Sequence, residues 1–110
     1  WVLPEHHPMT APRRALSATE IVTRLTQING DSAPGWKLID GALEKSFRFA
    51  DFHHTMAFVN ALAFIAHRAD HHPDLAVSYN QCKVRWSTHD VNGISVSDFE
   101  CAARVDALVV

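Results

Sequence analysis

The sequence predicts one α+β domain, a four-stranded antiparallel sheet with three helices packed on one face, in the order α-β-β-α-β-β-α. Three observations predict this fold class. Three segments repeat apolar residues at helical spacing, and two further regions alternate apolar and polar residues on either side of a turn. A chain of 110 residues is long enough for one domain with a modest core.

The composition is that of a globular protein. Apolar residues make up 47% of the chain, and the formal net charge of −2 includes no basic stripe that would suit nucleic acid. No apolar run approaches the roughly 18 to 20 residues of a membrane span. Cys82 and Cys101 lie in different predicted elements, so we expect buried free thiols and a cytoplasmic protein.

The N-terminal residues 1–16 contain three prolines and show no periodic pattern. We therefore expect a disordered or extended tail ahead of a single domain at 17–110. Met9 is interpreted as the native start, with residues 1–8 a remnant of expression or an upstream extension. His6 and His7 are left out of the candidate site for that reason.

Two capping boxes predict where the first and last helices begin, Ser17 with Glu20 and Ser95 with Asp98. Asn29-Gly30 supplies a stop signal for the first helix. The apolar side of the first helix consists of Ile21, Val22, Leu25 and Ile28, and that of the last helix consists of Phe99, Ala102, Ala103 and Val105.

Asp40-Gly41 predicts a two-residue hairpin turn between the first two strands. The alternation that follows suits a half-buried strand, and Trp36 and Leu38 should face the same way on the strand before the turn. The alternating sets are Lys45, Phe47 and Phe49 against Glu44, Ser46 and Arg48.

The longest periodic segment predicts a helix that Asp51 caps and Pro73 ends, with His71 and His72 in its last turn. It carries two apolar stripes, whereas a surface helix needs one. The second stripe predicts contact with another subunit, and therefore an oligomer. The stripes are Phe52, Met56, Val59, Ala63 and Ala66, and Phe58, Leu62, Ile65 and Ala69.

A second hairpin is predicted after Pro73, with its turn at Asn80-Gln81. This register sorts apolar residues to one face, and a shift of one residue would destroy the sorting. It also places His72 opposite His89, at one end of the sheet. Tyr79 and Trp86 are interpreted as hairpin core. The apolar pairs are Tyr79 with Cys82, Val77 with Val84, and Leu75 with Trp86.

The histidines allow three interpretations. His67 and His71 share a helix face and could bind zinc together with His72 or His89, but no HExxH pattern or cysteine spacing supports a metal site. Acid/base chemistry fits better, because an unperturbed histidine gives and takes a proton near neutral pH. The third interpretation is a helix C-cap with solvated rings. His53 and His54 are interpreted as surface residues.

From Trp36 onward the chain resembles the pterin-4a-carbinolamine dehydratase family, also described as a dimerisation cofactor of a hepatocyte nuclear factor. The shared segments are GW at 35–36, FRFADF from Phe47, DHHPD from Asp70, SYN ending at Asn80, and STHDVNGIS from Ser87. Tyr79, His89 and Asp98 match the spacing of an aromatic residue, a later histidine and an aspartate in the family signature.

The resemblance implies a hydro-lyase that dehydrates 4a-hydroxytetrahydrobiopterin to quinonoid dihydropterin in tetrahydrobiopterin recycling, with no metal or other cofactor. It implies that His71 and His89 transfer protons and that His72 binds the pterin. The remaining residues implied for the substrate pocket are Pro73, Thr88, Asp90 and Val91. The supporting positions are His67, Tyr79 and Asp98.

His67 stands where the family often has glutamate, so the rate and pH optimum could differ. The resemblance also implies a homodimer or homotetramer. The alternative is a non-catalytic assembly or transcriptional coactivator module on the same fold, which would bind a protein partner through the long helix. No direct binding to nucleic acid or membrane is expected.

Overall fold

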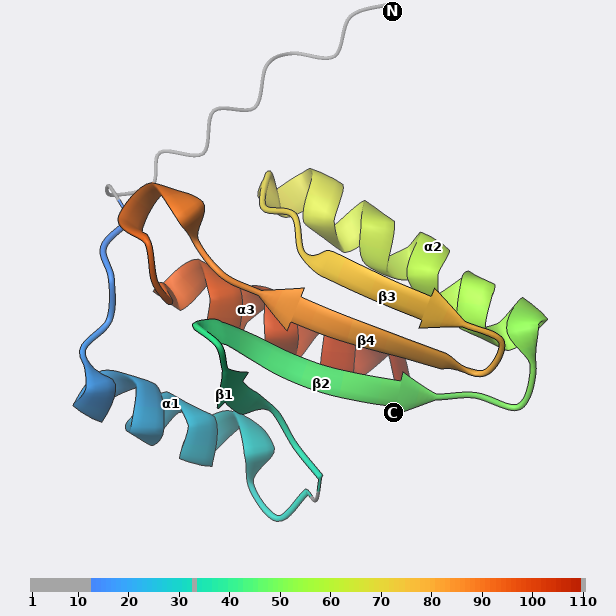
Figure 1. The fold of residues 1–110 in the computed structure, drawn as a ribbon, viewed down its shortest axis with the longest axis horizontal. Coiled ribbons are helices and arrows are strands. Elements are labelled where there is room, and N and C mark those ends of the chain that lie inside the picture. The colour runs from blue at the N-terminus through green and yellow to red at the C-terminus, as the bar shows by residue number, and fades with distance from the viewer. Residues whose placement is uncertain (1–12, 33, 110) are drawn as a thin grey trace, which may run out of the picture.

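The computed structural model describes residues 13–32 and 34–109. Its four strands form one antiparallel sheet in the order β1-β2-β4-β3, and α3 crosses behind β2 and β4 in Figure 1. The predicted fold class and element order are confirmed. The elements are α1 (Ala18–Asn29), β1 (Lys37–Ile39), β2 (Ala42–Arg48), α2 (Phe52–Ala69), β3 (Asp74–Ser78), β4 (Gln81–Trp86), the 3-10 turn η1 (His89–Val91), α3 (Val96–Asp106) and the 3-10 turn η2 (Ala107–Val109).

The core lies between the helices and one face of the two central strands. Because side chains alternate across a strand, β4 buries every second residue, while Lys83 and Arg85 point to the other face. Cys82 and Cys101 are buried free thiols, as predicted. The core residues of the central strands are Leu43, Phe47, Cys82, Val84 and Trp86, and those of α2 and α3 are Phe58, Leu62, Ala66, Phe99, Cys101, Ala102 and Val105.

The first hairpin has the predicted turn. Asp40 and Gly41 adopt φ angles of 49° and 78°, and Ile39 pairs with Ala42. Positive φ at both turn positions gives the twist that suits two antiparallel strands. Leu38 pairs with the buried Leu43 and so points to the helix-covered face, although it stays exposed on the edge strand.

The predicted register of the second hairpin is wrong by two residues. The turn is formed by Tyr79-Asn80, so that Ser78 pairs with Gln81. A shift of two residues returns every side chain to the same face, so the alternation could not distinguish the two registers. His72 is therefore not opposite His89. Tyr79 is 64% exposed at the turn, not part of the core, whereas Trp86 is fully buried as predicted.

The predicted end of the long helix is also wrong, because α2 ends at Ala69 and not at His72. Asp70 adopts a left-handed conformation, with φ 49° and ψ 45°. The backbone N–H groups of Asp70 and His71 donate back to the carbonyls of His67 and Ala66, which is a Schellman motif. His71 and His72 consequently lie beyond the helix, in the link to β3.

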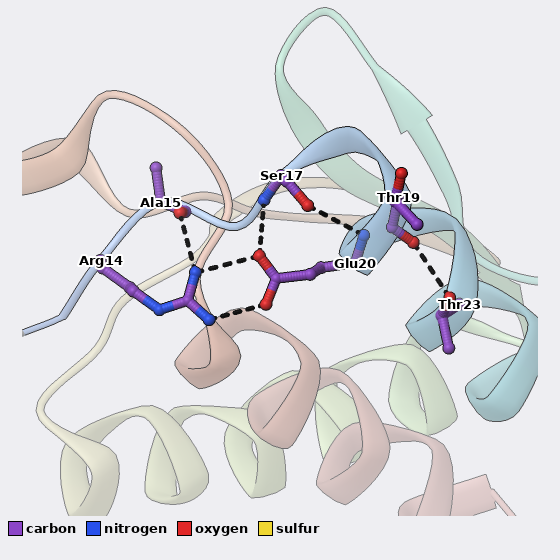
Figure 2. A network of polar contacts seen from close by, with 6 residues as sticks. All are labelled: Arg14, Ala15, Ser17, Thr19, Glu20 and Thr23. Carbon is purple, nitrogen blue, oxygen red and sulfur yellow. Dashed lines mark hydrogen bonds and ion pairs between the residues drawn. The ribbon is translucent and has the colours of Figure 1, made fainter.

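The capping box of α1 is confirmed and is drawn in Figure 2. Glu20 N–H donates to the Ser17 hydroxyl at 3.2 Å, and Ser17 N–H donates to the Glu20 carboxylate at 3.0 Å. Gly30 ends the helix with φ 51°, as the Asn29-Gly30 pair predicts. On its apolar side Ile21 is buried, while Val22 is exposed.

The two predicted stripes of α2 differ in burial. Phe58 and Leu62 of the second stripe are buried in the core, so this stripe faces the sheet of its own chain, and the prediction that it contacts another subunit is wrong. Phe52 of the first stripe is 49% exposed, and Phe64, which lies outside both stripes, is 66% exposed. The oligomer stays a prediction. In the described part of the chain, no helix combines the length and the hydropathy needed to cross a membrane.

Candidate active site

His71 is buried just beyond the end of α2. The Schellman motif turns the chain back over the core, and the His71 side chain is only 7% exposed. Its ring stacks on Trp86 with the ring centroids 5.5 Å apart and the planes 17° apart. Nε2 of His71 lies 2.5 Å from Oδ1 of Asp98, so the imidazole N–H donates to a buried carboxylate.

Asp98 joins three segments of the chain. It is fully buried in the first turn of α3, where Oδ2 accepts from the Thr88 hydroxyl at 2.7 Å and from Ser95 N–H at 2.9 Å. The Ser95 hydroxyl lies 2.6 Å from Oγ1 of Thr88. Because Thr88 donates its one hydroxyl proton to Asp98, Ser95 is the donor in its contact with Thr88. The carboxylate thus fastens the link after α2, the end of β4 and the start of α3 to one point.

The segment after β4 is a closed loop that presents His89. Thr88 N–H donates to Gly93 O at 2.8 Å, and Gly93 N–H donates back to Thr88 O at 3.3 Å. Between them lie η1 and Asn92, which adopts φ 51°. In Figure 1 this loop lies at the end of the sheet where α2 leads into β3.

The structure brings most of the predicted site residues to this end of the sheet. His71, Thr88 and Asp98 are joined directly and are buried. The side chain of Thr88 therefore supports Asp98 and does not line an open pocket. The exposed members are His72, His89 and Asp90, and the partly exposed members are Pro73 and Val91.

Two predicted supporting residues do not join this group. Tyr79 precedes β4 and Thr88 follows it, so the two residues lie at opposite ends of that strand. His67 is exposed on the last turn of α2. Among the described residues, no group of three or more histidine, cysteine, aspartate or glutamate residues is arranged to hold a metal ion.

Three residues around His71 were missed by sequence reasoning as parts of the site. Ser95 could have been found, because its capping box with Asp98 was predicted. For Trp86 the sequence predicts a place in the core but gives no link to His71. Arg13, whose Nη1 lies 3.5 Å from His71 Nδ1, gave no local signal, because 58 positions separate the two residues.

The two cysteines are not suited to act as nucleophiles. Burial raises the pKa of the Cys82 thiol, and it raises the pKa of the Cys101 thiol to about 11. A thiol in such surroundings stays protonated near neutral pH, and the thiolate is the reactive form. The chemistry available at this end of the sheet is therefore that of imidazole and carboxylate groups.

Comparison with known proteins points to one family. Residues 14–108 match the family model described as Pterin 4 alpha carbinolamine dehydratase. A protein of Paracidovorax citrulli provisionally named pterin-4-alpha-carbinolamine dehydratase is 58% identical over 100 residues, which span 88% of this chain and 83% of the relative. A protein of Xanthomonas euvesicatoria with the same provisional name is 48% identical over 109 residues, 97% of this chain and 92% of the relative.

Two solved structures share the fold. A transcriptional coactivator/pterin dehydratase from Brucella melitensis has a TM-score of 0.78 at 29% identity, covering 88% of this chain and 100% of that chain. A pterin dehydratase-like protein identified as a RuBisCO assembly factor in the alpha-carboxysome has a TM-score of 0.60 at 26% identity, covering 69% of this chain and 90% of that chain.

Proposed function

This chain belongs to the pterin-4a-carbinolamine dehydratase family and is a dehydratase of the hydro-lyase class, and we propose that it dehydrates 4a-hydroxytetrahydrobiopterin to the quinonoid dihydropterin. The observation that carries the proposal is the 2.5 Å contact between His71 and Asp98. Because Thr88 shares that carboxylate, the histidine pair and the His89 loop are held at the same end of the sheet. The product would serve the recycling of tetrahydrobiopterin in the cytoplasm.

The reaction moves two protons and breaks one carbon–oxygen bond. The hydroxyl on C4a leaves as water once its oxygen is protonated. N5 loses its proton, and the electron pair of that N–H bond becomes the second bond between N5 and C4a. No net electrons leave the pterin, so the chemistry calls for one acid and one base, and imidazole can serve as either near neutral pH.

Each histidine has a distinct position for this task. His71 and His89 are the proton-transferring pair of the proposal, and His72 orients the pterin. Asp98 occupies Nε2 of His71, so Nδ1, which Arg13 approaches to 3.5 Å, is the nitrogen proposed to exchange a proton. His89 is exposed on η1, where a substrate can reach it. The other residues proposed to line the pocket are Pro73, Asp90 and Val91.

Stopped-flow measurement of 4a-hydroxytetrahydropterin dehydration tests the proposal. The protein should accelerate the reaction above its spontaneous rate, and His89→Ala should remove about 10²-fold or more of the acceleration. His72→Ala should raise KM. His53→Ala is the matched control, because His53 is an exposed histidine in the first turn of α2. A folded protein that leaves the spontaneous rate unchanged would contradict the proposal.

Exposed apolar side chains on α2 favour a second role, in protein binding. Phe52 and Phe64 are 49% and 66% exposed on this helix, and exposed large apolar side chains suit a partner helix. A second copy of the chain, as a homodimer or homotetramer, is the partner we propose first. Phe64→Glu should then lower the mass measured by sedimentation while pterin turnover persists. If the wild-type protein is an oligomer and Phe64→Glu has the same mass, the subunits do not associate through Phe64.

A further inference from the structure

Arg13 reaches His71 from the segment that precedes α1. Its Nη1 donates to Nδ1 of His71 at 3.5 Å, and its Nη2 donates to the carbonyl oxygen of Asp70, also at 3.5 Å. The Asp70 carbonyl lies at the C-terminal end of α2, where the helix dipole attracts a cation. The guanidinium therefore occupies the side of the ring that faces away from Asp98.

Residues 13–17, here called the strap, hold Arg13 in place. Leu16 is buried in the core, and its N–H donates to Ile94 O at 2.7 Å, which ties the strap to the segment between the His89 loop and α3. On the other side, Arg14 donates to both carboxylate oxygens of Glu20, at 3.0 and 2.6 Å. Figure 2 shows this fork beside the capping box. The strap is thus fastened at Arg14 and Leu16, one and three residues after Arg13.

The two contacts of His71 require the same tautomer. A guanidinium has only donors, so the Arg13 contact requires an unprotonated Nδ1. The ionised carboxylate of Asp98 is an acceptor, so the proton of the neutral ring lies on Nε2. Two partners on opposite sides of the ring therefore present Nδ1 as a proton acceptor.

We propose that Arg13 is a positioning residue of the site, which holds His71 as the base of the dehydration. This rests on the function proposed above. His71 Nδ1 takes the proton from N5, and the freed electron pair forms the N5=C4a bond as the C4a–O bond breaks. The departing oxygen takes a proton from His89 and leaves as water. Nδ1 has one lone pair, so the N5–H group replaces the long Arg13 contact before the proton moves, while Arg13 keeps its contact with the Asp70 carbonyl. Exchange with solvent then returns both histidines to their starting states.

Nitrogen-15 NMR of the histidine rings tests the tautomer without substrate. In the wild-type protein, His71 should show its proton on Nε2. Arg13→Met, which keeps the length of the side chain but removes the donors, should give a mixture of tautomers, and Arg13→Lys should restore the wild-type spectrum. A wild-type spectrum with the proton on Nδ1 would overturn the proposal by itself, even if a variant failed to fold.

Kinetics test the role in the reaction. Arg13→Met should lower kcat roughly tenfold with KM unchanged, and Arg13→Lys should recover most of the loss. Arg48→Gln, an exposed site at the Tyr79 end of the sheet, is the matched control and should behave as wild type. An unchanged spectrum and kcat in Arg13→Met overturn the role of Arg13 while the dehydratase assignment stands. An inactive wild type with the expected spectra overturns the dehydratase assignment instead.

Discussion

Two helices of this protein begin with the same local motif in opposite surroundings. In α1 the Glu20 carboxylate accepts from Ser17 N–H at 3.0 Å, and in α3 the Asp98 carboxylate accepts from Ser95 N–H at 2.9 Å. The other partner of Glu20 is Arg14, whose side chain is 67% exposed. Asp98 is fully buried, and its other partners are His71 and Thr88.

The difference shows how burial changes what a capping box does. An exposed carboxylate can satisfy its remaining lone pairs with water, so the box of α1 needs nothing more from the fold. A buried carboxylate needs donors from the protein. The box of α3 therefore requires its neighbours to supply donors, and one of them is a histidine proposed to be catalytic.

Of the substitutions that test this difference between the two boxes, Asp98→Asn should have the largest effect. The amide keeps the shape but turns its NH₂ group toward a donor, which should lower the free energy of unfolding by about 2–4 kcal/mol. The loss of the correct His71 orientation should lower kcat/KM by about 10²-fold or more. Urea unfolding and stopped-flow kinetics measure the two effects, with Glu20→Gln as the exposed control. Equal effects of the two substitutions would show that burial does not distinguish the boxes.

His71 and His72 are adjacent, but only the substitution of His71 should lower the stability of the fold. His71→Ala leaves Asp98 with one donor fewer in a buried site. We expect the free energy of unfolding to fall by about 2–3 kcal/mol and turnover to be lost. His72 is exposed, so His72→Ala should change the free energy of unfolding by less than about 0.5 kcal/mol while weakening pterin binding. Urea unfolding and KM values check both variants. A stability loss in His72→Ala similar to that in His71→Ala would contradict the assignment of His71 alone to the buried network.

Removing one donor from the buried box should have a smaller effect. Thr88→Val keeps the side-chain volume but loses the hydroxyl that donates to Asp98 at 2.7 Å. We expect the free energy of unfolding to fall by about 1–2 kcal/mol. Thr88→Ser keeps the donor and should stay closer to wild type. Thermal unfolding of the two variants tests this. If Thr88→Ser is no more stable than Thr88→Val, the hydroxyl does not contribute to stability.

The exposed box should give the smallest effect, and one that depends on pH. The hydrogen bond from Arg14 lowers the pKa of Glu20 from 4.5 to about 2. Because the folded-state pKa is the lower one, the stabilisation is present above about pH 4.5 and is lost as the pH falls toward 2. The difference in Tm between wild type and Glu20→Gln should therefore be small at pH 7 and vanish near pH 2. A difference that stays constant over this range would show that the ion pair is not its source.

Local chemistry made much of the fold predictable. The capping box of α1 satisfies its own backbone groups within one helical turn, and Asp40-Gly41 tolerates the positive φ angles of its turn, so these features depend on neighbouring residues alone. The face of each central strand followed from the period of two. Of the candidate site, the sequence indicated imidazole chemistry near His71, while the separate roles of His72 and His89 came from resemblance to a family.

Features that depend on packing between distant segments were decided by the tertiary structure. The register of β3 on β4 could slip by two residues without moving a side chain to the other face, and the turn at Tyr79-Asn80 carries no positive φ that would mark it. The helix ended early because Asp70 took the left-handed position. The contacts of His71 with Asp98 and Arg13 join segments 27 and 58 residues away, and no local pattern records a contact that exists only once the core has formed.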